Sequence, residues 1–230
     1  MPGWKQTGSE RRTSVTRTSL VALLLIALSG CRTQPTSKGS VQPPEPARSV
    51  EWPLPQNASP QLKQMLAGAV EQVGITTGYD PAYVKIDYPS GDVPLETGVC
   101  SDVLVRAFRK AGIDLQKEVH EDMVTAWGVY PRKWGSPGPD SNIDHRRVLN
   151  LMTYFDRRGK LLPITDHRED YVPGDIVSWD LGGGVPHIGI VSNRAIGTPR
   201  HLLIIHNIGA GTRAQDVLFN WKITGHYRYF

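Results

Sequence analysis

The chain has 230 residues, 39% of them hydrophobic and 21% charged, which is enough for one domain with a real core and excludes a wholly disordered protein. Its two cysteines are too few for a disulfide scaffold or a cysteine-based zinc cluster. The formal net charge is +4, yet residues 1–30 contribute four bases and one acid, so the rest of the chain holds 22 bases and 21 acids. This balance gives no reason to expect a nucleic-acid partner.

Residues 1–30 have the pattern of an export signal. A basic, polar stretch runs into the apolar block LVALLLIAL at 20–28, which at nine residues is too short to span a bilayer core. The following LSGC sequence, which ends at Cys31, resembles the lipobox of bacterial lipoproteins, in which the cysteine is lipidated. The resemblance implies a lipid anchor on Cys31 and, because Arg32 follows rather than Asp, an outer-membrane location facing the periplasm. The alternative is an ordinary secretory cleavage site.

Residues 31–57 are rich in Pro, Ser, Gln and Thr and contain few large apolar side chains, which predicts a flexible tether. Residues 58–230 contain no internal repeat and predict one domain. The expected organisation is therefore a lipoprotein signal peptide at 1–30, a tether at 31–57 and a single domain at 58–230.

Three helices are expected in the first part of this domain. The first spans 59–74, where a Ser-Pro start precedes apolar residues three and four apart. The second spans 100–112 and has a cysteine at its start and a glycine at its end. The third is expected to begin at the cap residue Asp144 and to end at 159.

Short β-branched and aromatic runs follow the helices, at 174–181, 187–193, 201–208 and 221–230. Helices followed by a mostly antiparallel sheet make the expected class α+β. If the second and third runs pair as a hairpin, His187 and His206 lie at the same edge of the sheet. The two imidazoles are then neighbours.

Cys100 is the candidate nucleophile. At the start of a helix, unpaired N–H groups and the positive end of the helix dipole favour a thiolate over a thiol. Lipidation of Cys31 would leave Cys100 as the only free thiol and exclude a disulfide between the two. The alternative is a buried structural cysteine, since free cysteine is among the most buried residue types.

The runs PGDIVSW, PHIGIV and LLIIHN, downstream of a cysteine at a helix start, resemble the NlpC/P60 branch of the papain-like cysteine peptidases. Within it, TTGYDPAYVKIDYPSGDVPLETGVCSDV, VHEDM, NIDHRR, YVPGDIV and IIHNIG resemble the YijF-like bacterial family of unknown function. The resemblance implies an NlpC/P60-type fold, with N-terminal helices packed on the sheet, and hydrolysis of amide bonds in cell-wall peptides.

The resemblance also implies a triad of Cys100 as nucleophile, His187 as general base and His206 as the residue that orients His187. In the alternative, His206 is only a strand residue and Asn207 or a carboxylate orients the base. The implied mechanism is attack of the Cys100 sulfur on a carbonyl, with its backbone N–H as one oxyanion donor.

Several residues are candidates for the wall of a peptide groove. Arginine pairs with carboxylates in a two-pronged fashion, so the NIDHRR stretch and its neighbours suit a carboxylate-bearing peptide. The alternatives are a helix cap at Asp144, a favourable charge at the helix start for Asp102, an Asp-Pro turn at Asp80 and a solvated arginine face. The candidates are Tyr79, Asp80, Asp102, Asp122, Asp144, His145, Arg146, Arg147 and Asn207.

No metal or other cofactor is expected. His120, Glu121 and Asp122 are adjacent but lack the spacing of a zinc-protease helix. The function expected is a cysteine amide hydrolase acting on peptidoglycan peptides, anchored to the membrane by its lipid and subject to an unknown protein activator. Two alternatives stay open: a catalytically silent peptidoglycan-binding module, and an amidase or acyltransferase on a substrate outside the wall.

Overall fold

A computed structural model of the chain describes residues 49–199 and 201–230, which lie in the unit Glu45–Phe230. The export signal, Cys31 and most of the expected tether lie outside these residues and remain predictions. Within the described part, no helix has the length and apolar character needed to cross a membrane.

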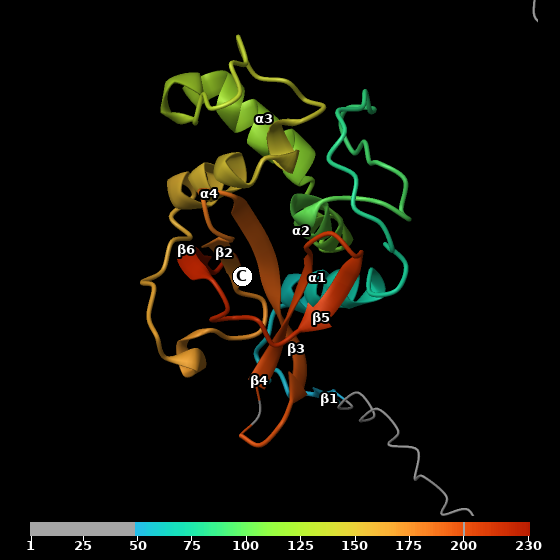
Figure 1. Cartoon of the computed structure of the whole chain (residues 1–230), viewed down its shortest axis with the longest axis vertical. Helices are drawn as coiled ribbons and strands as arrows, with labels where there is room; N and C mark the ends of the chain where they lie inside the picture. Colours follow the sequence, from blue (N-terminus) through green and yellow to red (C-terminus); the bar gives the residue numbers. More distant parts are fainter. Residues whose placement is uncertain (1–48, 200) are drawn as a thin grey trace, which may run out of the picture. The chain divides into compact units, whose positions relative to one another are not determined.

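A six-stranded antiparallel sheet forms the centre of the described fold (Figure 1). The strand order is β5-β4-β3-β2-β6, and β1 pairs with the C-terminal end of β3. The β3–β4 hairpin joins Ile196 to His201 and continues to the pair Ile190 and Ile205. The strands are β1 (Val50–Glu51), β2 (Ile176–Asp180), β3 (Pro186–Ile196), β4 (His201–Asn207), β5 (Thr212–Gln215) and β6 (Lys222–Tyr227).

Four α-helices precede β2 in the chain, and Figure 1 shows α3 and α4 stacked at one end of the sheet. Three short 3₁₀ helices connect them to one another and to the sheet. The α-helices are α1 (Pro60–Glu71), α2 (Cys100–Lys110), α3 (Leu115–Ala126) and α4 (Val148–Arg157); the 3₁₀ helices are η1 (Trp127–Val129), η2 (Asp144–Arg146) and η3 (Arg168–Asp170).

The two faces of the sheet are buried in different ways. On one face, side chains of all four α-helices pack against Ile176, Ile188, Ile190 and Ile205 in the main core. The other face carries a smaller core in which Trp179 and its neighbours are covered by the segments around η3 and Val217. An α+β fold with N-terminal helices packed on an antiparallel sheet is therefore confirmed.

The differences from the expected elements lie mostly outside the sheet's centre. Residues 49–57 were expected in the tether, but Val50 and Glu51 pair with β3, so the ordered domain begins before residue 58. Helix α3 was not expected at all. The third expected helix is divided, because Asp144 starts a 3₁₀ turn and Arg147 is the N-cap of α4.

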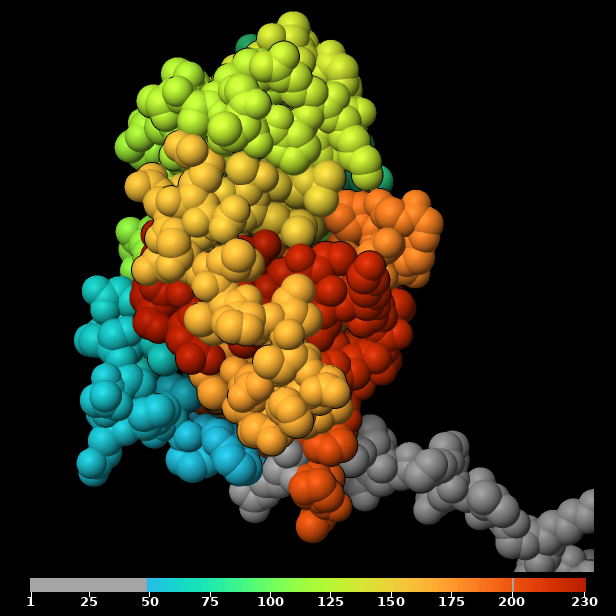
Figure 2. All heavy atoms as spheres, turned by 90° about the vertical axis from the view of Figure 1, so that its left-hand side faces the viewer, coloured from blue at the N-terminus to red at the C-terminus, as the bar shows by residue number. Residues whose placement is uncertain are grey.

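The segment between α4 and β2 runs over the surface beside the C-terminal strand, as Figure 2 shows in yellow and red. Leu162 N–H donates to the His226 carbonyl at 2.8 Å, and Arg228 N–H donates to the Lys160 carbonyl at 2.9 Å. This segment therefore closes one side of the domain and connects the helices to the sheet.

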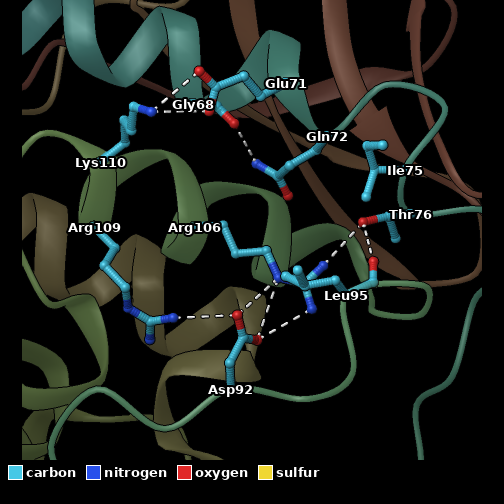
Figure 3. A pocket seen from close by; sticks show the side chains of 10 residues that line it. All are labelled: Gly68, Glu71, Gln72, Ile75, Thr76, Asp92, Leu95, Arg106, Arg109 and Lys110. Atoms are coloured by element: carbon cyan, nitrogen blue, oxygen red, sulfur yellow. Dashed lines mark hydrogen bonds and ion pairs between the residues drawn. The ribbon is translucent and has the colours of Figure 1, made fainter.

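A buried arginine in the middle of α2 holds the loop that leads to Cys100 (Figure 3). Arg106 pairs with Asp92 at 3.0 Å and donates to the hydroxyl of Thr76 and to the carbonyls of Val93, Pro94 and Thr97. Because one planar guanidinium binds both ends of residues 76–97, this loop is fixed against the helix that carries the cysteine.

A second buried arginine joins residues 114–172, the long connection between α2 and β2 that we call the insertion, to the start of α2. Arg146 pairs with Asp102 through Nε at 3.0 Å, and both side chains are at most 4% exposed. Its remaining donors reach the carbonyls of Asp80 and Ala82. Asp102 also accepts the backbone N–H of Val99 at 2.7 Å and so caps the helix. The Arg146–Asp102 ion pair and its neighbouring hydrogen bonds therefore hold three segments together. These are η2, the loop of residues 76–97 (the Tyr79 loop) and the start of α2 at Cys100.

Arg146→Met is expected to lower the free energy of unfolding by about 3–5 kcal/mol, because it leaves the buried Asp102 carboxylate without its partner. Arg147→Met is the matched control. The Arg147 side chain stacks on Trp134 at 4.4 Å, a contact whose loss costs about 0.5–1 kcal/mol. Urea denaturation of both variants measures the difference, and equal losses would contradict the role given to Arg146.

Candidate functional site

Cys100 is the first residue of α2 and faces the N-terminal end of β3. The thiol lies against the backbone N–H of Ile188, which directly follows His187. The residue is 4% exposed, and it lines a pocket of about 360 Å³ whose other walls come from the Tyr79 loop and from the insertion. The pocket lining consists of Tyr79, Pro81, Tyr83, Val99, Cys100, Trp134, Ile143, Arg146, Arg147, Val148 and Pro186.

His187 and His206 are hydrogen-bonded neighbours, as the hairpin predicted. His187 Nε2 lies 2.7 Å from His206 Nδ1, and His206 Nε2 lies 3.0 Å from Gln215 Oε1 on β5. Gly189 allows this approach, because a Cβ atom there would lie 3.1 Å from His206 Cβ. In this arrangement His206, and not Asn207, contacts the ring of His187.

Gln215 sets the direction of this chain of hydrogen bonds. Its amide oxygen can only accept, so His206 Nε2 carries the proton and His206 Nδ1 accepts from His187 Nε2–H. In a neutral His187 ring, Nδ1 is then the unprotonated nitrogen. The network therefore leaves a base on the side of His187 that does not face His206.

The two imidazoles lie in a nearly dry, aromatic environment. His187 is 2% and His206 1% exposed, and Trp179 packs at a tilt against His187 with ring centroids 5.8 Å apart. Burial, together with the neighbouring His206, lowers the pKa of His187 to about 3. Burial also lowers the pKa of His206, against the hydrogen bond that its Nε2 donates to Gln215, which raises it. Both rings are therefore neutral at pH 7.

The expectation of a thiolate at rest is wrong. Burial raises the pKa of the Cys100 thiol to about 12, and the Asp102 carboxylate raises it as well. The N–H groups of Ile188, Ser101 and Cys100 act in the expected direction but are outweighed. A helix start favours a thiolate only where water or a cation offsets the loss of solvation. At rest the Cys100 thiol and the His187 imidazole are therefore both neutral, and neither His187 nor His206 is among the residues that line the pocket of Cys100.

Tyr79 is the polar side chain of the pocket that lies near the cysteine. Burial, together with the nearby negative charge of Asp102, raises the pKa of its hydroxyl to about 12. The hydroxyl is therefore protonated at neutral pH and available as a hydrogen-bond donor on a residue that lines the same pocket as Cys100.

The other candidate wall residues divide between structural positions and the pocket. Asp80 accepts the N–H of Ala82 in a turn, and Asp102 serves the buried pair with Arg146. Asn207 donates to the carbonyls of Gly78 and Gly98 and so ties the loop to β4. These groups hold the walls of the site in place.

Three residues of the insertion do not line the pocket. Asp144 accepts from His120 at 2.9 Å and from the Asp140 N–H, and burial raises its pKa. His145 is 2% exposed, and burial lowers its pKa to about 4. Asp122 binds Arg157 and the hydroxyl of Tyr130. Their roles in this structure are within the packing of the insertion.

Two contributors to the site were not predicted. Gln215 lies on a four-residue strand that the sequence analysis missed, and only its pairing with β4 brings it to His206. Trp134 comes from the YPRKWG stretch, in which an aromatic residue directly after two bases was the available signal. Among the described residues, no group of three or more His, Cys, Asp or Glu side chains is arranged to hold a metal ion.

Comparisons with known proteins give a family. The chain is 58% identical to the uncharacterized protein YijF of Escherichia coli strain K12 over 165 residues, which are 71% of this chain and 79% of that protein. Among solved structures, it is similar to a lipoprotein-like protein of the NLP/P60 family from Staphylococcus aureus, with a TM-score of 0.36 and 15% identity. That match covers 78% of this chain and 43% of the other, so this chain spans less than half of its length. Residues 66–229 match the domain of unknown function DUF1287, and the chain therefore belongs to that family.

Proposed function

We propose that this protein is a cysteine amide hydrolase of the bacterial envelope, acting on peptidoglycan peptides through Cys100, His187 and His206. The observation that carries the proposal is the 2.7 Å bond between the two histidines, one residue from the backbone N–H that faces the sulfur. A nucleophile, a base and a group that orients the base are the parts that such a reaction requires.

The neutral resting pair supports general-base chemistry. As a substrate enters, the Cys100 thiol gives its proton to His187 Nδ1 while the sulfur bonds to the carbonyl carbon. The C–N bond then breaks, and the same proton goes from His187 to the leaving amine. Water attacks the thioester, with His187 again taking a proton, which releases a carboxylic acid and restores the thiol.

Two donors support stabilisation of the oxyanion. The backbone N–H of Cys100 lies at the start of α2, and the protonated hydroxyl of Tyr79 lies near the same sulfur. A preorganised donor of this kind contributes roughly 10²–10³ in rate in enzymes that form tetrahedral intermediates. Tyr79 is therefore the candidate for the second donor, which the sequence alone did not identify.

The choice of substrate rests on the export signal and on the resemblance of PHIGIV and its neighbours to NlpC/P60 peptidases. A lipid on Cys31 would hold the domain near the wall, and the tether would supply reach. The outer membrane, facing the periplasm, is the proposed location.

One observation favours a second candidate, a silent peptidoglycan-binding module. The sulfur is nearly buried, and burial raises the pKa of the Cys100 thiol to about 12, as in a structural cysteine. In that case the pocket holds a peptide without cutting it. Digestion separates the two candidates.

Purified sacculi incubated with the protein are expected to release new amines and carboxylates, identified by mass spectrometry. Cys100→Ala is expected to release none above background, because the nucleophile is gone. Identical product profiles for the two proteins would reject hydrolysis of this substrate.

His206→Ala is expected to lower kcat by at least about 10²-fold, because His187 then loses the acceptor that fixes its ring. His201→Ala is the matched control on the same strand, since His201 pairs with Asp216 at 2.7 Å and has no hydrogen bond to His187, His206 or Gln215. Turnover of the digested sacculi measures both variants. Equal losses of kcat in the two variants would contradict the role of His206 in orienting His187.

Alkylation of Cys100 by iodoacetamide is expected to rise about tenfold per pH unit between pH 6 and 9, because the raised pKa of the thiol keeps the thiolate rare throughout. Glutathione is the reference, since its rate levels off once the pH passes the ordinary thiol pKa near ~8.5. A fast rate at pH 6 that stays constant to pH 9 would show a preformed thiolate instead.

A further inference from the structure

Two adjacent arginines at the pocket have opposite environments. Arg146 uses its donors on Asp102, Asp80 and Ala82, and its side chain is 2% exposed. Arg147 is half-buried, and within residues 49–199 and 201–230 its guanidinium has no hydrogen bond and no ion pair. The two side chains have the same chemistry, yet only Arg147 has donors left for a ligand.

Trp134 holds this free guanidinium at the pocket. The Arg147 carbon Cζ lies 4.4 Å from the centroid of the Trp134 ring, in cation–π contact. This contact uses none of the guanidinium N–H groups, and two of them can bind a carboxylate with parallel hydrogen bonds. The aromatic contact therefore restricts the position of the cation before a ligand binds.

Asp140 is the carboxylate whose pKa the charge of Arg147 affects, and it already has other hydrogen-bond partners. Burial raises the pKa of Asp140, but hydrogen bonds from Asn142 and Tyr83 and the charge of Arg147 outweigh it, so the pKa is lowered. The Asp140 carboxylate, however, accepts from the Tyr83 hydroxyl at 3.0 Å and from Asn142, and no ion pair with Arg147 forms. Arg147 thus lines the pocket as a cation to which no anion of the described residues is bound.

The pocket joins this cation to the candidate nucleophile. Arg147, Trp134 and Cys100 line the same cavity of about 360 Å³, a volume near the lower limit for small-ligand sites. A space of this size takes only a residue or two of a peptide beside the bond at the sulfur. A carboxylate held by Arg147 therefore belongs to a residue at or next to that bond.

We propose that Arg147 binds a free carboxylate of the substrate beside Cys100, so that the protein selects acidic peptides; this specificity rests on the proposed amide hydrolysis. Arg146 takes no part in recognition and instead positions the pocket. Arg147 is thus the specificity-determining residue of the insertion.

The test compares two probes on the full chain. One is the muropeptide mixture released from sacculi by lysozyme, and the other is the same mixture with its carboxylates converted to amides. For the unchanged protein, amidation is expected to lower kcat/KM about 10- to 100-fold, the range of a charge-assisted pair. On the native mixture, Arg147→Met is expected to have a kcat/KM lower than that of the unchanged protein by the same factor. On the amidated mixture, the two proteins are expected to have equal kcat/KM values.

Arg147→Lys is expected to restore part of the loss, since it keeps the charge but not the fork. Urea denaturation of Arg147→Met excludes a folding defect as the cause. If amidation lowers kcat/KM equally in Arg147→Met and in the unchanged protein, the inference is overturned while the hydrolase stands.

A binding arm keeps the two proposals separate. In the Cys100→Ala background, the native mixture is expected to bind more tightly than the amidated one, by calorimetry, and Arg147→Met is expected to abolish the difference. This result without any cleavage by the unchanged protein supports the carboxylate site and rejects the hydrolase. Equal affinity for both probes, or binding of neither, overturns the site.

Discussion

The hydrogen bond between His187 and His206 is the contact on which the account of this protein depends. It requires β3 and β4 to pair in one register, and it requires Gly189 to leave space for the second ring. It also lets Gln215 determine the protonation of His187. The Gln215 oxygen accepts from His206 Nε2, so His206 Nδ1 must accept from His187 Nε2. Without these hydrogen bonds, burying two histidine side chains would only destabilise the fold, because their polar nitrogens would lose water without gaining a partner.

Burial gives this site its particular character. The same loss of water that raises the pKa of the thiol lowers the pKa of the imidazole, so neither group is charged before a substrate arrives. Charge separation would then develop only during the reaction, where the helix start and Tyr79 can stabilise it. The buried pair of Asp102 and Arg146 supplies the rigidity, since it connects the cysteine turn with the insertion.

The sequence predicted the parts of the fold that local patterns determine. The apolar spacing after Cys100 and the β-branched runs around His187 gave the helix, the strands and the neighbouring histidines. Helix α3 was readable from Leu115, Val119 and Met123, four residues apart, but was missed. Strand β1 was not readable, because a two-residue pairing in a proline-rich stretch depends on the distant edge of β3.

The site was less predictable than the fold. Whether Arg146 or Arg147 is free depends on where Asp102 and Trp134 lie in space, and the two residues look alike in the sequence. The pKa of Cys100 depends on how much water the whole domain excludes, which a helix-start rule cannot supply. Gln215 became visible only through the register of β5.

The most direct measurement is acid quenching of the protein during its reaction with muropeptides, followed by mass analysis of the peptide that contains Cys100. We expect an added mass equal to the acyl part of the substrate, bound as a thioester that hydroxylamine removes. Release of products with no adduct at Cys100 at any quench time, and undiminished release by Cys100→Ala, would contradict covalent catalysis by this cysteine.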